Sequence, residues 1–261
     1  MIQDMIKAIF FDVDGTLISH TTNEVSDSTR EVLDKLQEKG IKRIVATGRH
    51  MIELSMLPVK DIKFDGYITL NGQLVLDGEG NVLYENPIVG QDKQALVRLF
   101  NEKKIPVALV EKDRMYINYV NQNVESAQQA VSTPVPPVGE YTGEKIYLAI
   151  VYAGKEDEYI MSTELAGCKA TRWNDYGVDV ISASGGKAQG IKQYMKASGI
   201  ADKETIAFGD GVNDIEMLKV VNIGIAMGNA VMELKDEANY VTASVDKNGI
   251  ARALKFYDIF E

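Results

Sequence analysis

Short apolar runs alternate with amphipathic stretches over the first third of the chain. The run Ala8–Phe11 is apolar at every position, and polar residues and a glycine follow it. This pattern is typical of a strand buried on both faces of a parallel sheet. In the segments that separate this run from the next two apolar runs, the apolar residues recur at the spacing of a helix. The expected order is a strand at 8–11, a helix that starts at Ser26 or Ser28 and stops at Gly40, a strand at 41–46, a helix at 50–57 and a strand at 66–70.

The middle third has a different pattern. Paired short strands are separated by turn residues or helices, and prolines 134, 136 and 137 form a Pro-rich linker. Such a mixture predicts an α+β unit. The expected elements are a hairpin at 73–77 and 81–84, helices at 92–104, 122–131 and 156–165, and strands at 107–111, 115–120, 145–153, 168–174 and 178–182.

The alternation of helices and strands returns in the last third. Helices are expected at 187–198, 213–220, 230–238 and 249–256, and strands at 205–208, 223–226 and 240–242. The first and last thirds together predict an α/β fold with a doubly wound, Rossmann-like parallel sheet. We therefore expect a core domain at residues 1–82 and 183–261, interrupted by an inserted α+β domain at residues 83–182.

Composition excludes several classes of partner. The formal net charge of the 261 residues is 28 − 38 = −10, and no basic stripe is visible, so neither nucleic acid nor an anionic membrane surface is an expected partner. No apolar stretch reaches the length of a membrane span, residues 1–4 lack the basic start of a secretory signal, and no obligate protein partner is evident. Cys168 is the only cysteine, which suits the reducing cytoplasm and predicts a small core residue rather than a nucleophile.

Asp12 and Asp14 follow the first strand, where open α/β sheets bind ligands. Two carboxylates this close repel, which indicates a bound cation or a shared proton. A calcium loop would need Gly and Glu where the chain has Leu17 and Asn23, so that motif is excluded. The remaining alternative from this segment alone is a solvated turn.

Polar residues also follow three other expected strands. They are Thr47-Gly48, Asn71, and Gly209-Asp210-Gly211-Val212-Asn213-Asp214, and Lys187 begins a helix. Taken singly, Thr47 fits a helix cap and Lys187 a solvated charge. A P-loop is excluded, because Ile181 stands in place of its first glycine and Ala188 in place of its hydroxyl residue.

Together these residues match the needs of one reaction. Asp12 and Asp210 offer the hard oxygen ligands that Mg²⁺ prefers. The Thr47 hydroxyl, the Gly48 amide and the Lys187 ammonium offer donors to a phosphoryl group. A carboxylate pair, a hard metal and an oxyanion site together predict phosphoryl transfer.

The motifs resemble a known family. Asp12-Val-Asp-Gly-Thr, Thr47, Lys187 and Gly209-Asp210-Gly-Val-Asn213-Asp214 are similar to the four ordered motifs of the haloacid dehalogenase-like hydrolase superfamily. Ala46-Thr47-Gly48-Arg49, Ile68-Thr69-Leu70-Asn71-Gly72 and Ala226-Met227-Gly228-Asn229-Ala230 resemble the Cof-type sugar-phosphate phosphatases, and the insertion resembles their large α/β cap.

The resemblance implies a Mg²⁺-dependent phosphatase that acts on small phosphorylated metabolites, chiefly sugar phosphates. It implies Asp12 as nucleophile and Asp14 as general acid and base. It implies Mg²⁺ held by Asp12, the Asp14 backbone carbonyl and Asp210, with Asp214 ordering a metal-bound water. Thr47, Gly48, Lys187 and Asn213 are then expected to bind the transferring oxygens.

Two other functions use a similar core. They are a phosphomutase and a non-catalytic sensor of phosphorylated metabolites, whereas a dehalogenase would not need Asp210 and Asp214. Arg49 is left with two interpretations, a substrate contact or a helix-surface charge. His20 and His50 are expected on the surface, and Arg172, Trp173 and Asp175 are candidates for substrate recognition in the inserted domain.

Overall fold

The computed structural model describes residues 5–131, 133–157 and 159–260. Residues 1–4, where the sequence shows no basic start of a signal, lie outside the described part. The chain forms two compact units. Unit 1 comprises the described residues of Met1–Arg49, Leu54–Tyr84 and Gly186–Glu261, and unit 2 comprises His50–Glu53 and Glu85–Gly185. Residues 50–53 thus belong to unit 2, although the sequence placed them in the core.

Unit 1 is built on a sheet that has eight strands among the described residues. Their order is β13 (Tyr240–Val241), β12 (Ile223–Ala226), β11 (Thr205–Gly209), β1 (Ala8–Phe11), β2 (Lys42–Ala46), β3 (Gly66–Thr69), β4 (Leu74–Asp77) and β5 (Val82–Glu85). Neighbours from β13 to β3 are parallel, and β4 is antiparallel to β3. The first strands and the last strands of the chain therefore meet in one sheet at β1 and β11.

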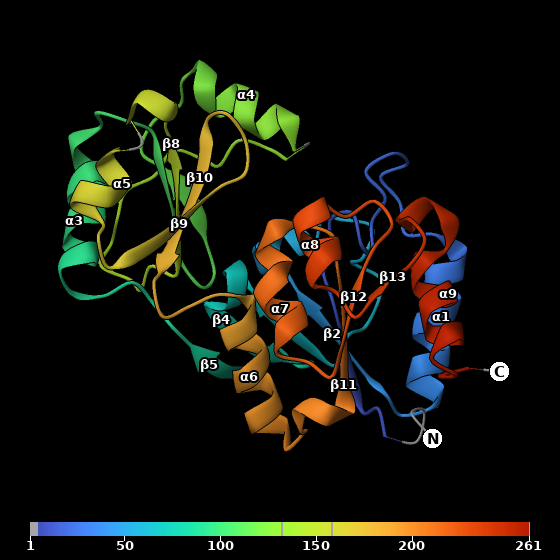
Figure 1. The fold of residues 1–261 in the computed structure, drawn as a ribbon. Coiled ribbons are helices and arrows are strands. Elements are labelled where there is room, and N and C mark those ends of the chain that lie inside the picture. The colour runs from blue at the N-terminus through green and yellow to red at the C-terminus, as the bar shows by residue number, and fades with distance from the viewer. Residues whose placement is uncertain (1–4, 132, 158, 261) are drawn as a thin grey trace. The chain divides into compact units, whose positions relative to one another are not determined.

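Helices cover both faces of this sheet (Figure 1). On one face lie α1 (Asp27–Glu38) and α9 (Gly249–Phe256), and on the other α6 (Lys187–Ser198), α7 (Ile215–Lys219) and α8 (Met232–Glu237). Alternate strand residues, such as Ala8 and Phe10, share a buried cluster with the second group. Ser26, one of the two caps expected, begins α1 by accepting the Thr29 amide.

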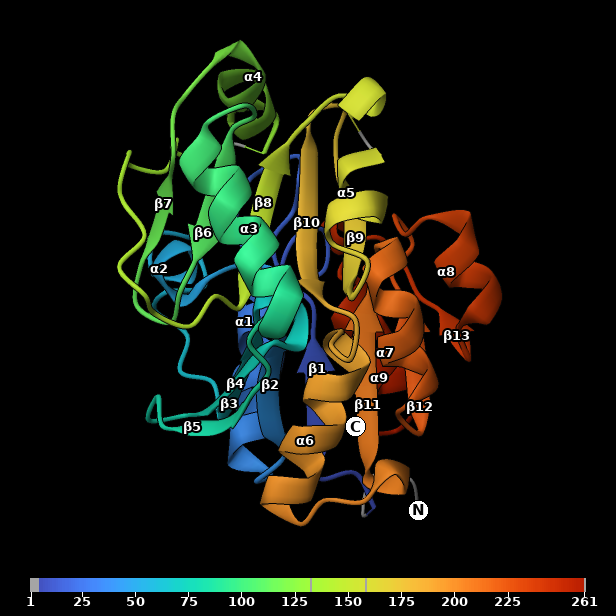
Figure 2. The same cartoon turned by 90° about the vertical axis from the view of Figure 1, so that its left-hand side faces the viewer.

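Unit 2 contains an antiparallel sheet of five described strands, and helices pack on its two faces (Figure 2). The order is β7 (Met115–Ile117), β6 (Val107–Val110), β8 (Leu148–Tyr152), β10 (Gly177–Ser182) and β9 (Cys168–Arg172). One buried cluster joins residues of α3 (Gly90–Glu102) and α5 (Tyr159–Glu164) to Ala149 and Val151 of β8. Tyr152 packs in the cluster of α4 (Gln122–Ala130), as alternation along a strand requires.

The α/β fold with a parallel core sheet and an additional antiparallel sheet confirms the predicted fold class. Some boundaries differ. The helix expected at 50–57 is only α2 (Met51–Leu54), and turn residues lie between its end and Pro58. Where a helix was expected at 156–165, the described residues form a 3₁₀ turn (Lys155–Asp157) and α5 (Tyr159–Glu164), and residue 158 lies outside the described part.

The strand expected to end at residue 70 stops at Thr69. Leu70, Asn71 and Gly72 all have left-handed backbone angles, with φ of 53°, 53° and 82°. This backbone costs little for Gly but 1–2 kcal/mol or so for residues with a Cβ. The Asn-Gly pair in the sequence indicated a turn, but nothing in the sequence indicated the left-handed backbone of Leu70 before it.

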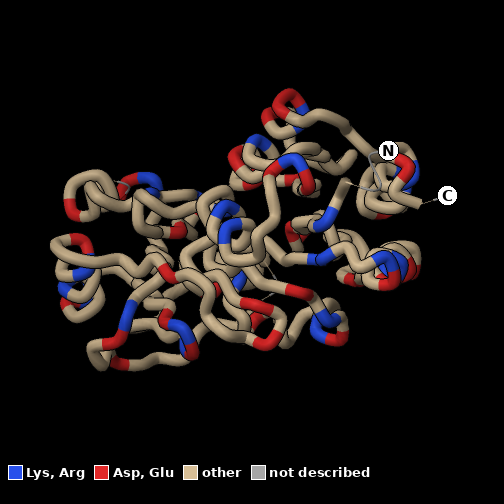
Figure 3. The backbone as a smooth tube through the Cα atoms, turned by 90° about the horizontal axis from the view of Figure 1, so that it is seen from below, with Lys and Arg blue, Asp and Glu red and all other residues tan. Residues whose placement is uncertain are grey.

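No helix among the described residues is long and apolar enough to cross a membrane. Lys and Arg are interspersed with Asp and Glu along the described backbone (Figure 3). The remaining short helices are 3₁₀ turns at Leu70–Gly72, Asp202–Glu204, Val212–Asp214 and Val245–Lys247.

Gly66 gives a test of packing in unit 1. A Cβ at this position in β3 would overlap the Tyr194 ring of α6. We expect Gly66→Ala to lower the free energy of unfolding by about 1–3 kcal/mol, measured by urea denaturation, because the core is overpacked. In a Tyr194→Leu background the same substitution should cost less, since the ring is gone. Equal losses in the two backgrounds would contradict this packing.

Candidate active site

The site lies where neighbouring parallel strands of unit 1 end. Asp12 follows β1, Thr47 follows β2, Asn71 lies just beyond β3, and Asp210 follows β11. These four strands are adjacent in the sheet, so their carboxyl ends lie along one edge. That edge is where open α/β sheets bind ligands.

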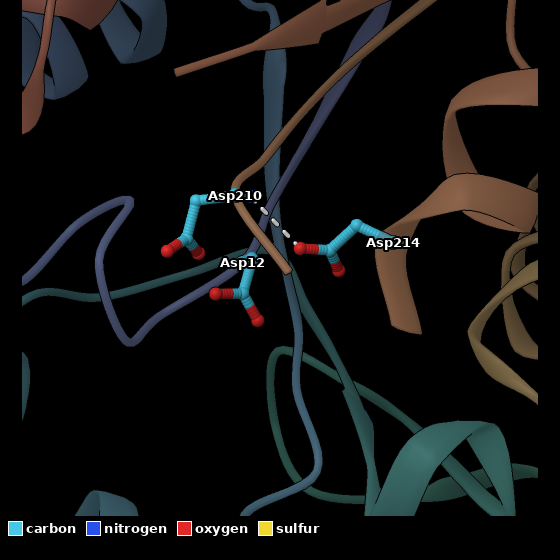
Figure 4. Close-up of side chains that lie close together, drawn as sticks. All are labelled: Asp12, Asp210 and Asp214. Atoms are coloured by element: carbon cyan, nitrogen blue, oxygen red, sulfur yellow. Dashed lines mark hydrogen bonds between the residues drawn. The ribbon is translucent and has the colours of Figure 1, made fainter. Parts of the chain in front are cut away.

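Three carboxylates converge at this edge (Figure 4). One oxygen from each of Asp12, Asp210 and Asp214 lies within 4.8 Å of the others. Asp12 and Asp214 are buried, and Asp210 is partly exposed. Like charges so close and so poorly hydrated need a cation.

Lys187, the first residue of α6, supplies part of that charge. Its Nζ donates to Oδ1 of Asp12 and to Oδ1 of Asp214, both at 2.6 Å, and its side chain is 1% exposed. Burial lowers the pKa of Lys187, but the two carboxylates outweigh this effect and hold the pKa above its usual value. The lysine is therefore a buried, charged cross-link, not the solvated surface charge considered as its alternative.

Asp214 is occupied on both oxygens. Oδ1 accepts from Lys187, and Oδ2 accepts the backbone amides of Asp210 and Gly211 at 3.0 Å each, the first of which is drawn in Figure 4. Its side chain thus fixes the loop that presents Asp210. Among the described residues, the Asp210 carboxylate accepts only long hydrogen bonds, from the Thr16 hydroxyl at 3.4 Å and the Asn229 side-chain amide at 3.5 Å. Asp12 and Asp210 are consequently the two members with oxygens available to a ligand.

The cluster has more acidic groups than positive charges to balance them. Burial raises the pKa of Asp12 well above its ordinary value, and nearby carboxylates add to the rise while Lys187 opposes it. Burial and the Asp214 charge raise the pKa of Asp210 to about 7. Three carboxylates facing one ammonium, with hard oxygens free on two of them, fit a divalent cation.

Two glycine positions keep the site open. A Cβ at Gly15, where φ is +80°, would overlap the Asp210 carboxylate. A Cβ at Gly48 would lie 3.2 Å from the side-chain amide of Asn71. Side chains at either position would displace groups of the site.

Asp14 lies outside the three-carboxylate cluster and pairs with Arg49. Arg49 Nε donates to Oδ2 and Nη2 to Oδ1 of Asp14, each at 3.0 Å. Both interpretations of Arg49 from the sequence missed this contact, because each considered the residue without a partner from another strand end.

The candidate phosphoryl-binding groups surround the same edge. Thr47 is buried, and its Oγ1 accepts the Arg49 amide at 3.1 Å, which leaves its own proton to donate. Asn213 is exposed, and its Nδ2 donates to Oδ1 of Asn71 at 3.4 Å. Asn71 therefore joins the site between Gly48 and Asn213. The sequence indicated Asn71 only through its position after an expected parallel strand.

Asn229 is a second residue that the expected set missed. Its Nδ2 donates to the Gly15 carbonyl at 2.8 Å, and its Oδ1 accepts the Val245 amide at 2.9 Å. It thereby links the loop after β1 to the loop after β13, and its longer contact reaches Asp210. The motif around residues 226–230 contained it, but no chemistry in the sequence indicated this role.

The structure also bears on three other residues that the sequence singled out. The surface position expected for His50 is wrong, because it is 2% exposed and its ring contacts the carbonyls of Glu111 and Lys112 within unit 2. Arg172 Nη1 donates to the carbonyls of residues 153, 174 and 175, so it ties the turn between β9 and β10 to the residue after β8. Cys168 is half-buried, and burial raises the pKa of its thiol to about 12, which agrees with a packing role.

Comparison with known proteins shows the family to which the chain belongs. A family model described as haloacid dehalogenase-like hydrolase matches residues 9–254. YkrA of Bacillus subtilis (strain 168), named as a candidate phosphatase, is 34% identical over 254 residues, which cover 95% of this chain and 96% of YkrA.

Two solved structures are similar over almost the whole chain. BT1666 from Bacteroides thetaiotaomicron, described among phosphatases of the haloalkanoate superfamily, has a TM-score of 0.88 at 35% identity, covering 98% of this chain and 96% of that one. The subclass IIB sugar phosphatase BT4131 has a TM-score of 0.85 at 33% identity, covering 97% and 100%. With an aspartate cluster at its strand ends, this chain belongs to the haloacid dehalogenase-like hydrolases, as one of the phosphatases of that family.

Proposed function

We propose that the protein is a Mg²⁺-dependent phosphatase of small phosphorylated metabolites, chiefly sugar phosphates, which acts through an aspartyl phosphate at Asp12. The observation that carries this proposal is the contact of the Lys187 ammonium with the carboxylates of Asp12 and Asp214. It occupies Oδ1 of Asp12 and so turns one carboxylate oxygen away from reaction, while Oδ2 stays available for attack. The similarity to the sugar phosphatase BT4131 supports the substrate class.

The reaction proceeds as two displacements. Oδ2 of Asp12 forms a bond to phosphorus while the bond from phosphorus to the leaving oxygen breaks. The leaving oxygen takes the electron pair and a proton from Asp14. Asp14 then takes a proton from the water that attacks the aspartyl phosphate, which releases phosphate and restores Asp12.

Positively charged and donor groups stabilise the transferring oxygens. Lys187 uses two of its three N–H donors on carboxylates, which leaves the third to donate to the phosphoryl group. The Thr47 hydroxyl, the Gly48 amide and Asn213 provide further donors around the same strand ends.

Mg²⁺ would be held by carboxylate oxygens of Asp12 and Asp210 and by the Asp14 backbone carbonyl. When bound, it supplies positive charge that offsets the repulsion between the nucleophile and the phosphate. Asp214 was expected to order a metal-bound water; we assign its side chain the role of fixing the Asp210 loop, because its Oδ2 accepts the Asp210 and Gly211 amides.

The domain roles are part of the proposal. Unit 1 carries the chemistry, and unit 2 acts as the substrate-selecting cap. The single cysteine supports a cytoplasmic location. A phosphomutase would transfer the phosphoryl group to a second sugar, and a sensor would bind without turnover, so release of inorganic phosphate from a sugar phosphate distinguishes the three functions.

Asp12→Asn tests the nucleophile. The amide cannot form the acyl phosphate, so kcat should fall by at least ~10³-fold, about 4 kcal/mol of barrier. The measurement is hydrolysis of nitrophenyl phosphate, with circular dichroism to verify folding. Asp34→Asn, on the exposed side of α1, serves as the matched control and should retain activity. Asp12→Asn activity within tenfold of the wild type would exclude the covalent mechanism.

Metal removal tests the cation site. Excess chelator should abolish hydrolysis of nitrophenyl phosphate, and added Mg²⁺ should restore it. Ca²⁺ should restore it poorly, because it favours more ligands and looser geometry. Titration calorimetry should also show weaker Mg²⁺ binding by Asp210→Asn. Full activity in excess chelator would rule out the role given to Asp210.

A further inference from the structure

The ion pair between Arg49 and Asp14 connects two neighbouring strand ends of unit 1. The guanidinium contacts the carboxylate through two N–H groups, each at 3.0 Å. Such a two-point contact fixes the plane of the carboxylate as well as its position. A carboxylate offers about four lone-pair sites, so each oxygen of Asp14 keeps one for a further partner.

The backbone of Arg49 is itself anchored. Its amide donates to Oγ1 of Thr47 at 3.1 Å, and its carbonyl accepts the Leu70 amide at 3.2 Å. These contacts tie Arg49 to the ends of β2 and β3. The Arg49 side chain is 16% exposed and that of Asp14 34%, so the pair is partly shielded from water.

We propose that Arg49 is the positioning residue for the general acid and base, and holds the Asp14 carboxyl so that the oxygen site that carries the transferred proton faces the leaving oxygen. This inference rests on the proposed function, in which Asp14 exchanges protons with the substrate. Arg49 acts through Asp14 rather than on the phosphoryl group. A lysine would keep the charge but not the planar two-point contact.

The dependence on leaving group tests this role. Departure of phenolate from phenyl phosphate needs protonation, whereas dinitrophenolate leaves readily without it. The kcat/KM value covers the steps up to departure of the leaving group. Arg49→Ala and Arg49→Lys should each lower kcat/KM for phenyl phosphate by roughly 10- to 100-fold, and for dinitrophenyl phosphate by less than about threefold.

Arg43→Lys is the matched control. Arg43 lies on β2, away from its carboxyl end, and pairs with Asp65. Arg43→Lys should alter the free energy of unfolding. It should leave the ratio of kcat/KM for phenyl phosphate to kcat/KM for dinitrophenyl phosphate unchanged. Arg49→Lys keeps the length and charge of the side chain, so the test remains valid where Arg49→Ala folds poorly.

A double-mutant cycle separates a route through Asp14 from an independent one. With phenyl phosphate, Arg49→Ala should change kcat/KM by less than about twofold in an Asp14→Asn background, because the group that it positions is absent. Selective loss on phenyl phosphate with this non-additivity supports the inference. Equal losses on both substrates, or the full loss in the Asp14→Asn background, would overturn it while leaving the phosphatase mechanism intact.

Failure of the proposed function would look different. Wild-type enzyme that hydrolyses neither aryl phosphate, or Asp14→Asn with full activity on phenyl phosphate, would overturn the acid and base role of Asp14 and the role of Arg49 with it.

Discussion

The buried contact of Lys187 with Asp12 and Asp214 is the interaction on which the site depends. The ammonium and both carboxylates are almost fully shielded from water, and each N–O distance is 2.6 Å. Removal of one member of a buried ion pair typically costs about 3–5 kcal/mol, because its partner is left uncompensated. The same contact orients the proposed nucleophile and fixes the loop of Asp210. Stability and chemistry of this edge are therefore linked through one side chain.

The order of the strands explains how these residues meet. β1 and β11 are neighbours in the sheet although unit 2 and much of the core separate them in sequence. The start of α6 packs beside the turn after β3, where Gly72 leaves no room for a Cβ against Gly186. This close approach places the start of α6, and with it Lys187, beside the strand ends. Insertion of most of unit 2 between β5 and α6 leaves the parallel order of the core intact.

Much of this arrangement could be predicted from the sequence. Apolar runs that end in Asp12, Thr47, Asn71 and Asp210 identified four strand ends of one parallel sheet, because a parallel sheet aligns its carboxyl edges. Their adjacency follows from the strand order of the structure. The sequence could not show which polar groups pair across that edge. Arg49 with Asp14, and Asn71 with Asn213, depend on the paths of two loops each. The burial of His50 likewise depends on tertiary contacts within unit 2 that local polarity does not reveal.

The central claim is that Asp12 carries the phosphoryl group during turnover. Rapid acid quench during steady-state hydrolysis of a sugar phosphate, followed by proteolysis and mass spectrometry, tests it directly. The account predicts one added phosphoryl group on the peptide that contains Asp12, and its loss on treatment with hydroxylamine. Sustained turnover with no phosphorylated peptide, or with the phosphoryl group on another residue, would contradict it.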